Sequence, residues 1–196
     1  MNLISKLLDE PFFYDLIQLP LGMDFYKVAK DKITKYPHKS VIEIGCGTGK
    51  LLSYLKPKKY LGLDINERYL NHAKKHYQRS GIIFLIQDAT KINKIDGYYD
   101  LLLMINFIHH LSTKELRTVL KRILENVNFS RIIVLDSKPD FGIFTKMLEK
   151  ADQGNHFRNL KQIVNIYKKY FNITETRVVK KFYWLYKYPM IVARKK

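Results

Sequence analysis

The sequence predicts a doubly wound α/β domain, in which helices cover both faces of a mostly parallel sheet. Apolar runs of strand length alternate with segments of helical periodicity, and no linker rich in Pro, Gly or Ser divides the 196 residues. The runs are nearly continuous in apolar residues, as strands buried on both faces require. We expect five such strands, at residues 41–44, 60–63, 82–86, 100–105 and 131–135. Strands that alternate with helices in this way are typical of a doubly wound sheet.

The segments between these runs carry signals for helix starts. Ser112 and Glu115 have the spacing of a capping box, and an apolar stripe follows them to Val127. Asn66 can cap another helix, whose apolar face carries Leu70, Ala73 and Tyr77. A further helical stripe near the C-terminus consists of Leu160, Ile163, Val164, Tyr167 and Phe171.

The two ends of the chain are expected to differ in structure. Residues 172–181 and 188–194 have the pattern of two strands, so the domain is expected to end in an antiparallel β-hairpin. The first 36 residues read as mostly helical and could cap the sheet edge or close over a site. We therefore expect one domain over residues 1–196, with a helical cap at 1–36, a core at 37–136, and an insert plus hairpin at 137–196.

Composition limits the class of protein. The longest apolar run, residues 101–108, is interrupted by Asn106 and is too short to span a bilayer, and the N-terminus lacks the pattern of a secretory signal. A single cysteine, Cys46, excludes a disulfide framework or a cysteine-cluster metal site. We expect a cytoplasmic protein without a membrane span or a bound metal.

The formal net charge of +17 has two interpretations. A strongly basic chain can bind nucleic acid. Lysine supplies 27 of the 35 basic residues, however, and occurs in scattered pairs, as an AT-rich coding sequence would produce without selection for binding. Both interpretations stay open at this point.

A glycine-rich loop, Gly45-Cys46-Gly47-Thr48-Gly49, follows the first predicted strand, where a helix is expected to begin. Glycines at such a point allow a tight turn and let a ligand approach the backbone N–H groups. In α/β sheets, ligands bind beyond the carboxyl ends of the strands. The glycine spacing is nevertheless wrong for the dinucleotide-binding fingerprint, which has two residues between its second and third glycines.

Polar residues follow the next strands as well. Asp64 ends the second strand and can accept hydrogen bonds from two ribose hydroxyls. Asp88 and Ala89 follow the third strand and could meet an adenine edge, and Asn106 begins the segment after the fourth. Together these strand ends predict a nucleoside site far more specifically than any one of them does.

At these motifs the chain resembles the class I S-adenosylmethionine-dependent methyltransferases. Residues 41–49, 61–65, 87–89 and 99–106 are similar to that family's first four motifs, and the resemblance covers roughly residues 35–136. His109-His110-Leu111 resembles a sequence found in small-molecule methyltransferases of types 11 and 12. The usual Pro-Gly-Gly turn before the fifth strand is replaced by residues 126–130. The family implies a Rossmann-like sheet of seven strands and S-adenosyl-L-methionine as the cofactor.

The resemblance also implies roles for single residues. Those implied to lie at the cofactor are Glu43, Gly45, Cys46, Gly47, Gly49, Asp64, Ile65, Asp88, Ala89 and Asn106. Asp64 would hold the ribose, Ile65 would pack on the adenine, and Asn106 would lie near the methionine ammonium. We interpret Cys46 as a small side chain of the loop and not as a nucleophile.

The reaction and its acceptor are less well defined by the sequence. His110, and then His109, are candidate catalytic bases, although a histidine pair at a strand end can also be purely structural. Candidate substrate contacts are Tyr14, His156 and Arg158. The motif with two prolines that marks amino-directed DNA methyltransferases is absent after Asn106, which favours a small-molecule or lipid-linked acceptor. An RNA or protein methyltransferase and a non-catalytic cofactor-binding module remain as alternatives.

Overall fold

The computed structural model describes residues 25–139, 156–181 and 186–196. Its strands are β1 (Ser40–Ile44), β2 (Lys59–Asp64), β3 (Ile82–Ile86), β4 (Ile95–Ile105), β5 (Val127–Leu135), β6 (Lys138–Pro139), β7 (Phe171–Lys181) and β8 (Tyr186–Lys195). Its α-helices are α3 (Phe25–Ile33), α4 (Glu67–Tyr77), α5 (Thr113–Asn126) and α7 (Leu160–Tyr167). All five strands predicted for the core are present, and β4 and β5 are longer than predicted.

The described strands form one sheet in the order β3-β2-β1-β4-β5-β8-β6, with β7 paired to the other edge of β8. Neighbours from β3 to β5 are parallel, and β8 runs antiparallel to β5, β6 and β7. The short β6 pairs with β8 in the same register as β5 does, and residues 136–137 separate β5 from β6. β6 therefore continues β5 along the same edge of β8. The predicted seven-stranded sheet with a C-terminal antiparallel hairpin is thereby confirmed.

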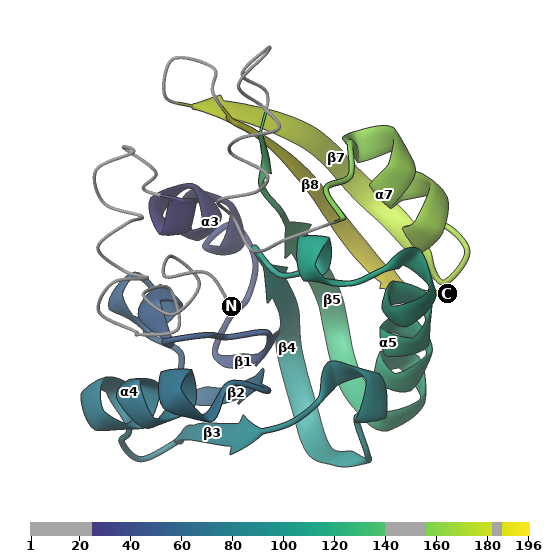
Figure 1. Cartoon of the computed structure of the whole chain (residues 1–196). Coiled ribbons are helices and arrows are strands. Elements are labelled where there is room, and N and C mark those ends of the chain that lie inside the picture. The colour runs from purple at the N-terminus through teal and green to yellow at the C-terminus, as the bar shows by residue number, and fades with distance from the viewer. Residues whose placement is uncertain (1–24, 140–155, 182–185) are drawn as a thin grey trace, which may run out of the picture.

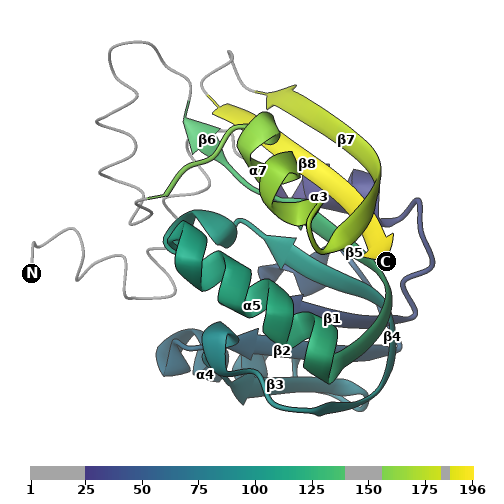
Figure 2. The ribbon, with the colours of Figure 1, turned by 90° about the vertical axis from the view of Figure 1, so that its right-hand side faces the viewer.

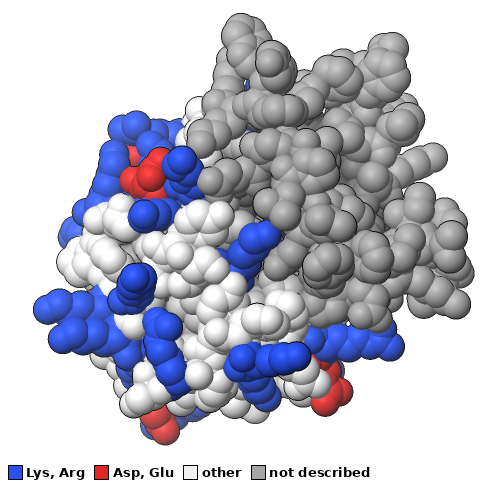
Figure 3. Space-filling model, turned by 90° about the vertical axis from the view of Figure 1, so that its left-hand side faces the viewer, with Lys and Arg blue, Asp and Glu red and all other residues white. Residues whose placement is uncertain are grey.

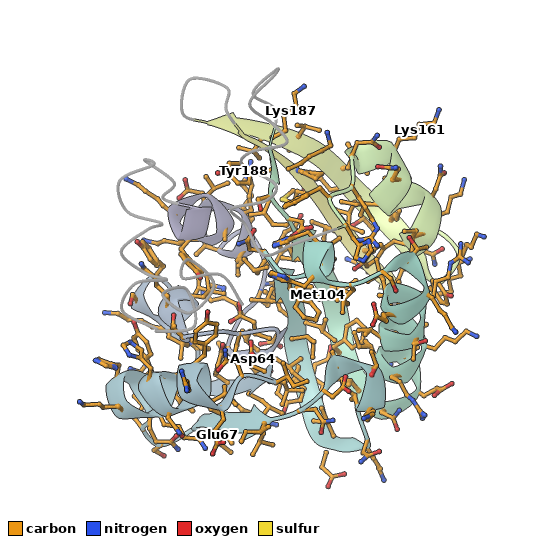
Figure 4. All side chains as sticks on the ribbon, viewed as in Figure 1. Asp64, Glu67, Met104, Lys161, Lys187 and Tyr188 are labelled. Atoms are coloured by element: carbon orange, nitrogen blue, oxygen red, sulfur yellow. The ribbon has the colours of Figure 1, made fainter. Side chains whose placement is uncertain are left out.

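Helices cover both faces of this sheet. Figures 1 and 2 show α3 and α4 on one side of it and α5 and α7 on the other. Each face has its own buried core, and Figure 4 labels one member of each. Tyr188 of β8 belongs to the core under α3 and α4, whereas Met104 of β4 belongs to the core under α5 and α7. This double burial explains why the central strands β1 and β4 are apolar on both faces. The edge strand β3 differs from the expectation, because Ile83, Leu85 and Ile86 are exposed.

The helices begin where the sequence places their caps. The Asn66 side chain accepts hydrogen bonds from the N–H groups of Arg68 and Tyr69 at the start of α4. Ser112 and Glu115 form the predicted capping box of α5. Asn159 and Gln162 form a second capping box, at the start of α7.

Three details differ from expectation. The glycine loop leads into a 3₁₀ helix of four residues (Lys50–Ser53), and not into an α-helix. Phe171, which the periodicity assigns to the α7 stripe, is instead the first residue of β7. Residues 127–130 belong to β5, which begins directly after α5. The strand therefore takes the place of the Pro-Gly-Gly turn that this chain lacks.

The expected helical cap and the expected insert are described only in part, and residues 140–155 of the insert lie outside the described residues. Of the predicted helical cap, α3 lies within the described residues, while residues 1–24, including Tyr14, lie outside them.

None of the described helices has the length and apolarity needed to cross a membrane.

The α5 capping box yields a stability prediction. Ser112→Ala removes the hydroxyl that accepts a hydrogen bond from the Glu115 N–H, so the free energy of unfolding should fall by about 1 kcal/mol in urea denaturation. Lys114→Ala, at an exposed position in the same helical turn, is the matched control and should change it by less than about 0.5 kcal/mol. Equal effects of the two substitutions would show that the cap does not stabilise α5.

Candidate functional site

The carboxyl ends of β1 to β5 lie at one edge of the sheet, and the predicted site residues gather there. The glycine loop after β1 has positive φ at Gly45 (74°), Gly47 (54°) and Gly49 (71°). A Cβ on Gly45 would lie 2.2 Å from the Phe107 ring, so only glycine fits at this position. A Cβ on Gly47 would meet no described atom within 4 Å. Among the described residues, none fills the space that a side chain of Gly47 would occupy, and a ligand-binding loop needs such an opening.

Asp64, at the tip of β2, fixes the loop in place. Its Oδ2 accepts a hydrogen bond from the Gly47 N–H (2.8 Å), and its Oδ1 accepts one from the Asn66 N–H (2.9 Å). The N–H groups of Gly45 and Cys46 donate to the carbonyl of Leu63, at 2.8 and 3.1 Å. Burial raises the pKa of Asp64, and the backbone hydrogen bonds oppose that rise. A carboxylate has about four acceptor positions, so Asp64 can still accept hydrogen bonds from ligand hydroxyls.

Glu43 lies in β1, two residues before the first glycine of the loop, and β1 lies between β2 and β4 in the sheet. It is 2% exposed, and its Oε2 accepts a hydrogen bond from the Tyr60 hydroxyl at 2.5 Å. Burial raises the pKa of Glu43 to about 8, and the nearby Asp64 carboxylate adds to the rise, while the Tyr60 hydrogen bond lowers it. Glu43 thus joins β1 to β2. Its predicted role of orienting the loop stays a prediction.

Cys46 faces inward from the loop. The side chain is 5% exposed, and burial raises the pKa of its thiol well above the ordinary value, with Glu43 and Asp64 adding to the rise. A thiol with a raised pKa carries little thiolate at neutral pH, so the geometry supports the interpretation of Cys46 as a packing residue.

The predicted adenine contacts lie at the next two strand tips. Ile65 directly follows β2 and is 68% exposed. Asp88 accepts hydrogen bonds from the hydroxyl and the N–H of Thr90. The hydrogen bond from the Thr90 hydroxyl is the main cause that lowers the pKa of Asp88, and desolvation opposes it. Ala89 follows as the first residue of a short 3₁₀ helix. An exposed apolar side chain near an acid matches a purine, which has an apolar face and a hydrogen-bonding edge.

Asn106 directly follows β4 and has a backbone conformation that side chains rarely adopt. Its φ of 52° makes it the single non-glycine residue with positive φ in the described part of the chain. The Asn106 N–H donates to the carbonyl of Leu135 (2.8 Å), and its Oδ1 accepts a hydrogen bond from the Ser137 hydroxyl (2.6 Å). Both partners belong to the tip of β5, so β5 determines how Asn106 is presented.

The two candidate bases occupy different environments. His109 is fully buried, and its Nδ1 lies 2.7 Å from Oδ1 of Asp136, which is 1% exposed. The His109 ring also stacks on Phe157, with centroids 5.1 Å apart and an interplanar angle of 7°. His110 is exposed, and its ring lies 4.1 Å from that of His109. Only His110 of this pair can meet an acceptor from solvent without rearrangement.

His156 and Arg158, predicted to contact substrate, lie against the segment that follows β4. The His156 N–H donates to the His109 carbonyl at 2.9 Å. The Arg158 guanidinium is buried and donates to the carbonyls of Ile108 (2.7 Å), Leu111 (2.6 Å) and His156 (3.0 Å). These contacts make Arg158 a clamp within the protein, and its predicted contact with substrate stays a prediction. His156 remains exposed.

The structure adds residues that the sequence analysis did not single out. Asp136 and Ser137 hold His109 and Asn106, and Phe107 and Phe157 pack beside the glycine loop and His109. Asp136 and Ser137 could have been found, because they directly follow a predicted parallel strand beside the fourth. The two phenylalanines carry no local signal. Among the described residues, no group of His, Cys, Asp or Glu side chains could hold a metal ion.

The chain is similar to known methyltransferases in sequence and in fold. Residues 41–128 match the family model of a methyltransferase domain. The chain is 33% identical over 75 residues to a fatty-acid O-methyltransferase of Mycolicibacterium smegmatis, a match that covers 36% of this chain and 27% of that protein. It has the same identity over the same length to a phthiotriol/phenolphthiotriol dimycocerosates methyltransferase of Mycobacterium tuberculosis, covering 36% of this chain and 28% of that protein. The matches thus span little more than a quarter of these relatives.

Solved structures show the same fold over nearly the whole chain. The N-methyltransferase NodS from Bradyrhizobium japonicum WM9, in complex with S-adenosyl-L-homocysteine, superposes with a TM-score of 0.73 at 14% identity, covering 98% of this chain and 96% of NodS. Magnesium protoporphyrin IX methyltransferase from Synechocystis PCC 6803, with the same compound bound, gives 0.66 at 16% identity, covering 100% and 89%. The predicted fold and the predicted resemblance are confirmed.

The buried Glu43 yields a prediction about pH. Its pKa is about 8 in the folded chain and 4.5 when exposed, so between these values the unfolded state releases a proton that the folded state keeps. The contribution of Glu43 to stability is therefore greatest below pH 4.5 and is lost as the pH rises towards 8, at up to about 1.4 kcal/mol per pH unit. Glu43→Gln, which resembles the neutral form, should become progressively more stable than the wild type over that range.

Urea denaturation between pH 5 and 8.5 measures this difference. Titrations of other groups are common to both proteins and cancel. The control is Glu125→Gln, which makes the same substitution at an exposed position of α5. If wild type and Glu43→Gln lose stability in parallel as the pH rises, Glu43 does not keep its proton on folding.

Proposed function

We propose that this chain, which has the class I methyltransferase fold and whose residues 41–128 match a methyltransferase domain, transfers a methyl group from S-adenosyl-L-methionine to a small-molecule or lipid-linked acceptor. The observation that carries the proposal is the hydrogen bond between the Gly47 N–H and Asp64. It places a glycine whose Cβ position meets no described atom beside a carboxylate with unused acceptor capacity, at the strand ends where nucleosides bind in α/β folds.

The residues at the strand tips fit this cofactor in chemistry as well as in place. Asp64 would accept hydrogen bonds from the ribose hydroxyls, and the exposed Ile65 would cover an adenine face. Asp88 and Ala89 would meet the adenine edge, and Asn106 would face the methionine end. The open backbone at Gly47 leaves room for a ligand to pass along the loop.

When bound, S-adenosyl-L-methionine supplies a methyl group already activated by its sulfonium. The remaining task of the chain is to hold an acceptor in line with that group and to exclude water. An acceptor hydroxyl must also lose a proton, and an exposed imidazole is suited to take it. We assign that role to His110, since His109 is buried against Asp136 and Phe157.

A small or lipid-linked acceptor is supported by two kinds of observation. The relatives that match by sequence are named for fatty-acid and dimycocerosate substrates. The segment after β4 continues from Asn106 to His110 without the prolines that amino-directed nucleic-acid methyltransferases use to grip a flipped base. We expect the protein to act in the cytoplasm.

A second candidate, methylation of RNA, is favoured by the charge of the surface. Figure 3 shows Lys and Arg spread over the visible part of one face, with few Asp or Glu. The lysines of α3 and α4 that are exposed include Lys27, Lys30, Lys74 and Lys75. If RNA is the acceptor, its binding should weaken steeply as salt rises, because bound phosphates release counterions.

Thermal unfolding tests the cofactor site. S-adenosylhomocysteine at about 100 times its dissociation constant should add about 2.7 kcal/mol to stability, which raises the melting temperature by roughly 5–10 °C. Asp64→Ala should abolish the rise, because it removes the acceptor for ribose and releases Gly47. Asp96→Ala, an exposed site in the first residues of β4, should keep it. No shift for the wild type, or an equal shift with NAD, would contradict the proposal.

Transfer of labelled methyl groups tests the reaction and its acceptor. Wild-type protein, His110→Ala and His76→Ala are incubated with labelled S-adenosylmethionine and separate fractions of small metabolites, lipids and RNA. Loss of a general base should lower the rate by about 100-fold or more in His110→Ala, with the affinity for S-adenosylhomocysteine unchanged. His76, an exposed residue of α4, is the control and should be dispensable. Unchanged transfer by His110→Ala would show that His110 is not the base, and labelling of RNA alone would favour the second candidate.

A further inference from the structure

The tip of β5 controls the one unusual backbone position in the site. Ser137 lies just beyond β5, is 5% exposed, and places its hydroxyl 2.6 Å from Oδ1 of Asn106. Asn106 in turn has its φ at 52° and donates its N–H to Leu135. Asparagine tolerates this conformation better than most residues, although glycine would do so with less strain. The presence of a side chain at this position therefore needs an explanation other than the turn.

The contact with Ser137 determines which end of the Asn106 amide faces outward. The orientation of an amide is set by its hydrogen-bond network. A separation of 2.6 Å suits an O–H···O bond and is short for an N–H···O bond. The buried Ser137 hydroxyl thus donates to Oδ1, and the Nδ2 group of Asn106 points away from β5. No described residue accepts a hydrogen bond from that Nδ2 group.

We propose that Ser137 is a positioning residue which turns the Asn106 amide so that its Nδ2 donates to the carboxylate at the amino-acid end of the cofactor. This inference rests on the proposed function and refines it, since the site would then bind the carboxylate of the cofactor as well as its nucleoside. An amide nitrogen is a donor and cannot accept a hydrogen bond from an ammonium. The side chain of Asn106 therefore serves the carboxylate, and the ammonium must be met by other groups.

The test compares two ligands that differ only in that carboxylate. Calorimetry with the full chain measures the affinity for S-adenosylhomocysteine and for decarboxylated S-adenosylhomocysteine. The wild type should bind the carboxylated compound about tenfold to a hundredfold more tightly, as expected for a hydrogen bond to a charged group. Ser137→Ala should weaken S-adenosylhomocysteine binding about two- to tenfold and leave the decarboxylated compound unaffected.

A second variant, Asn106→Asp, tests the charge of the group that faces the ligand carboxylate. Aspartate tolerates the same φ and still accepts the Ser137 hydrogen bond, but it replaces the donor by a negative charge. Its preference should therefore reverse, with tighter binding of the decarboxylated compound. Such a reversal cannot arise from misfolding, which would weaken both ligands. Ser40→Ala is the control, because Ser40 accepts a hydrogen bond from Asp100 N–H at the start of β1, at the opposite end of the sheet. It should change neither affinity.

The outcomes separate this inference from the proposed function. Equal wild-type affinities for the two ligands, or equal losses for both in Ser137→Ala and Asn106→Asp, would overturn the carboxylate assignment and leave the cofactor site standing. Failure of the wild type to bind either ligand would overturn the proposed function and this inference with it.

Discussion

The site depends on the carboxylate of Asp64. Its two oxygens hold the N–H groups of Gly47 and Asn66, so one side chain joins the loop after β1, the tip of β2 and the start of α4. Burial raises the pKa of Asp64, and these backbone hydrogen bonds offset part of the cost of removing its charge from water. The loop can then hold three glycines at positive φ and keep the Gly47 backbone open.

The other half of the site is organised by the tip of β5. Asp136 and Ser137 interrupt the strand where it passes from β5 to β6, and each holds one residue of the segment after β4. Arg158 clamps the same segment through the carbonyls of Ile108 and Leu111. The segment that carries Asn106 and His110 is therefore fixed both by the residues after β5 and by Arg158. Such fixing is what in-line transfer requires, since small misplacements of the reacting groups cost much of the rate.

Local patterns in the sequence predict the strands, the helix caps and the strand-end acids, because each depends on residues close together in the chain. Ser112 with Glu115, and Asp64 at the end of an apolar run, are examples. Three other features depend instead on partners that are distant in the sequence. They are the short 3₁₀ helix after Gly49, the position of Phe171 in β7 and the clamp by Arg158. The difference in burial between His109 and His110 also depends on distant residues. His109 is buried against Asp136 and Phe157, which are 27 and 48 positions away from it in the sequence.

The central claim is that these strand tips bind the cofactor as one site, and an NMR titration of ¹⁵N-labelled protein with S-adenosylhomocysteine tests it most directly. The account predicts that the amide signals of Gly47, Ile65 and Asn106 shift together and saturate at one equivalent. The signal of Gly97, near the start of β4, should stay in place. Shifts confined to other parts of the chain, or none at saturating ligand, would contradict it.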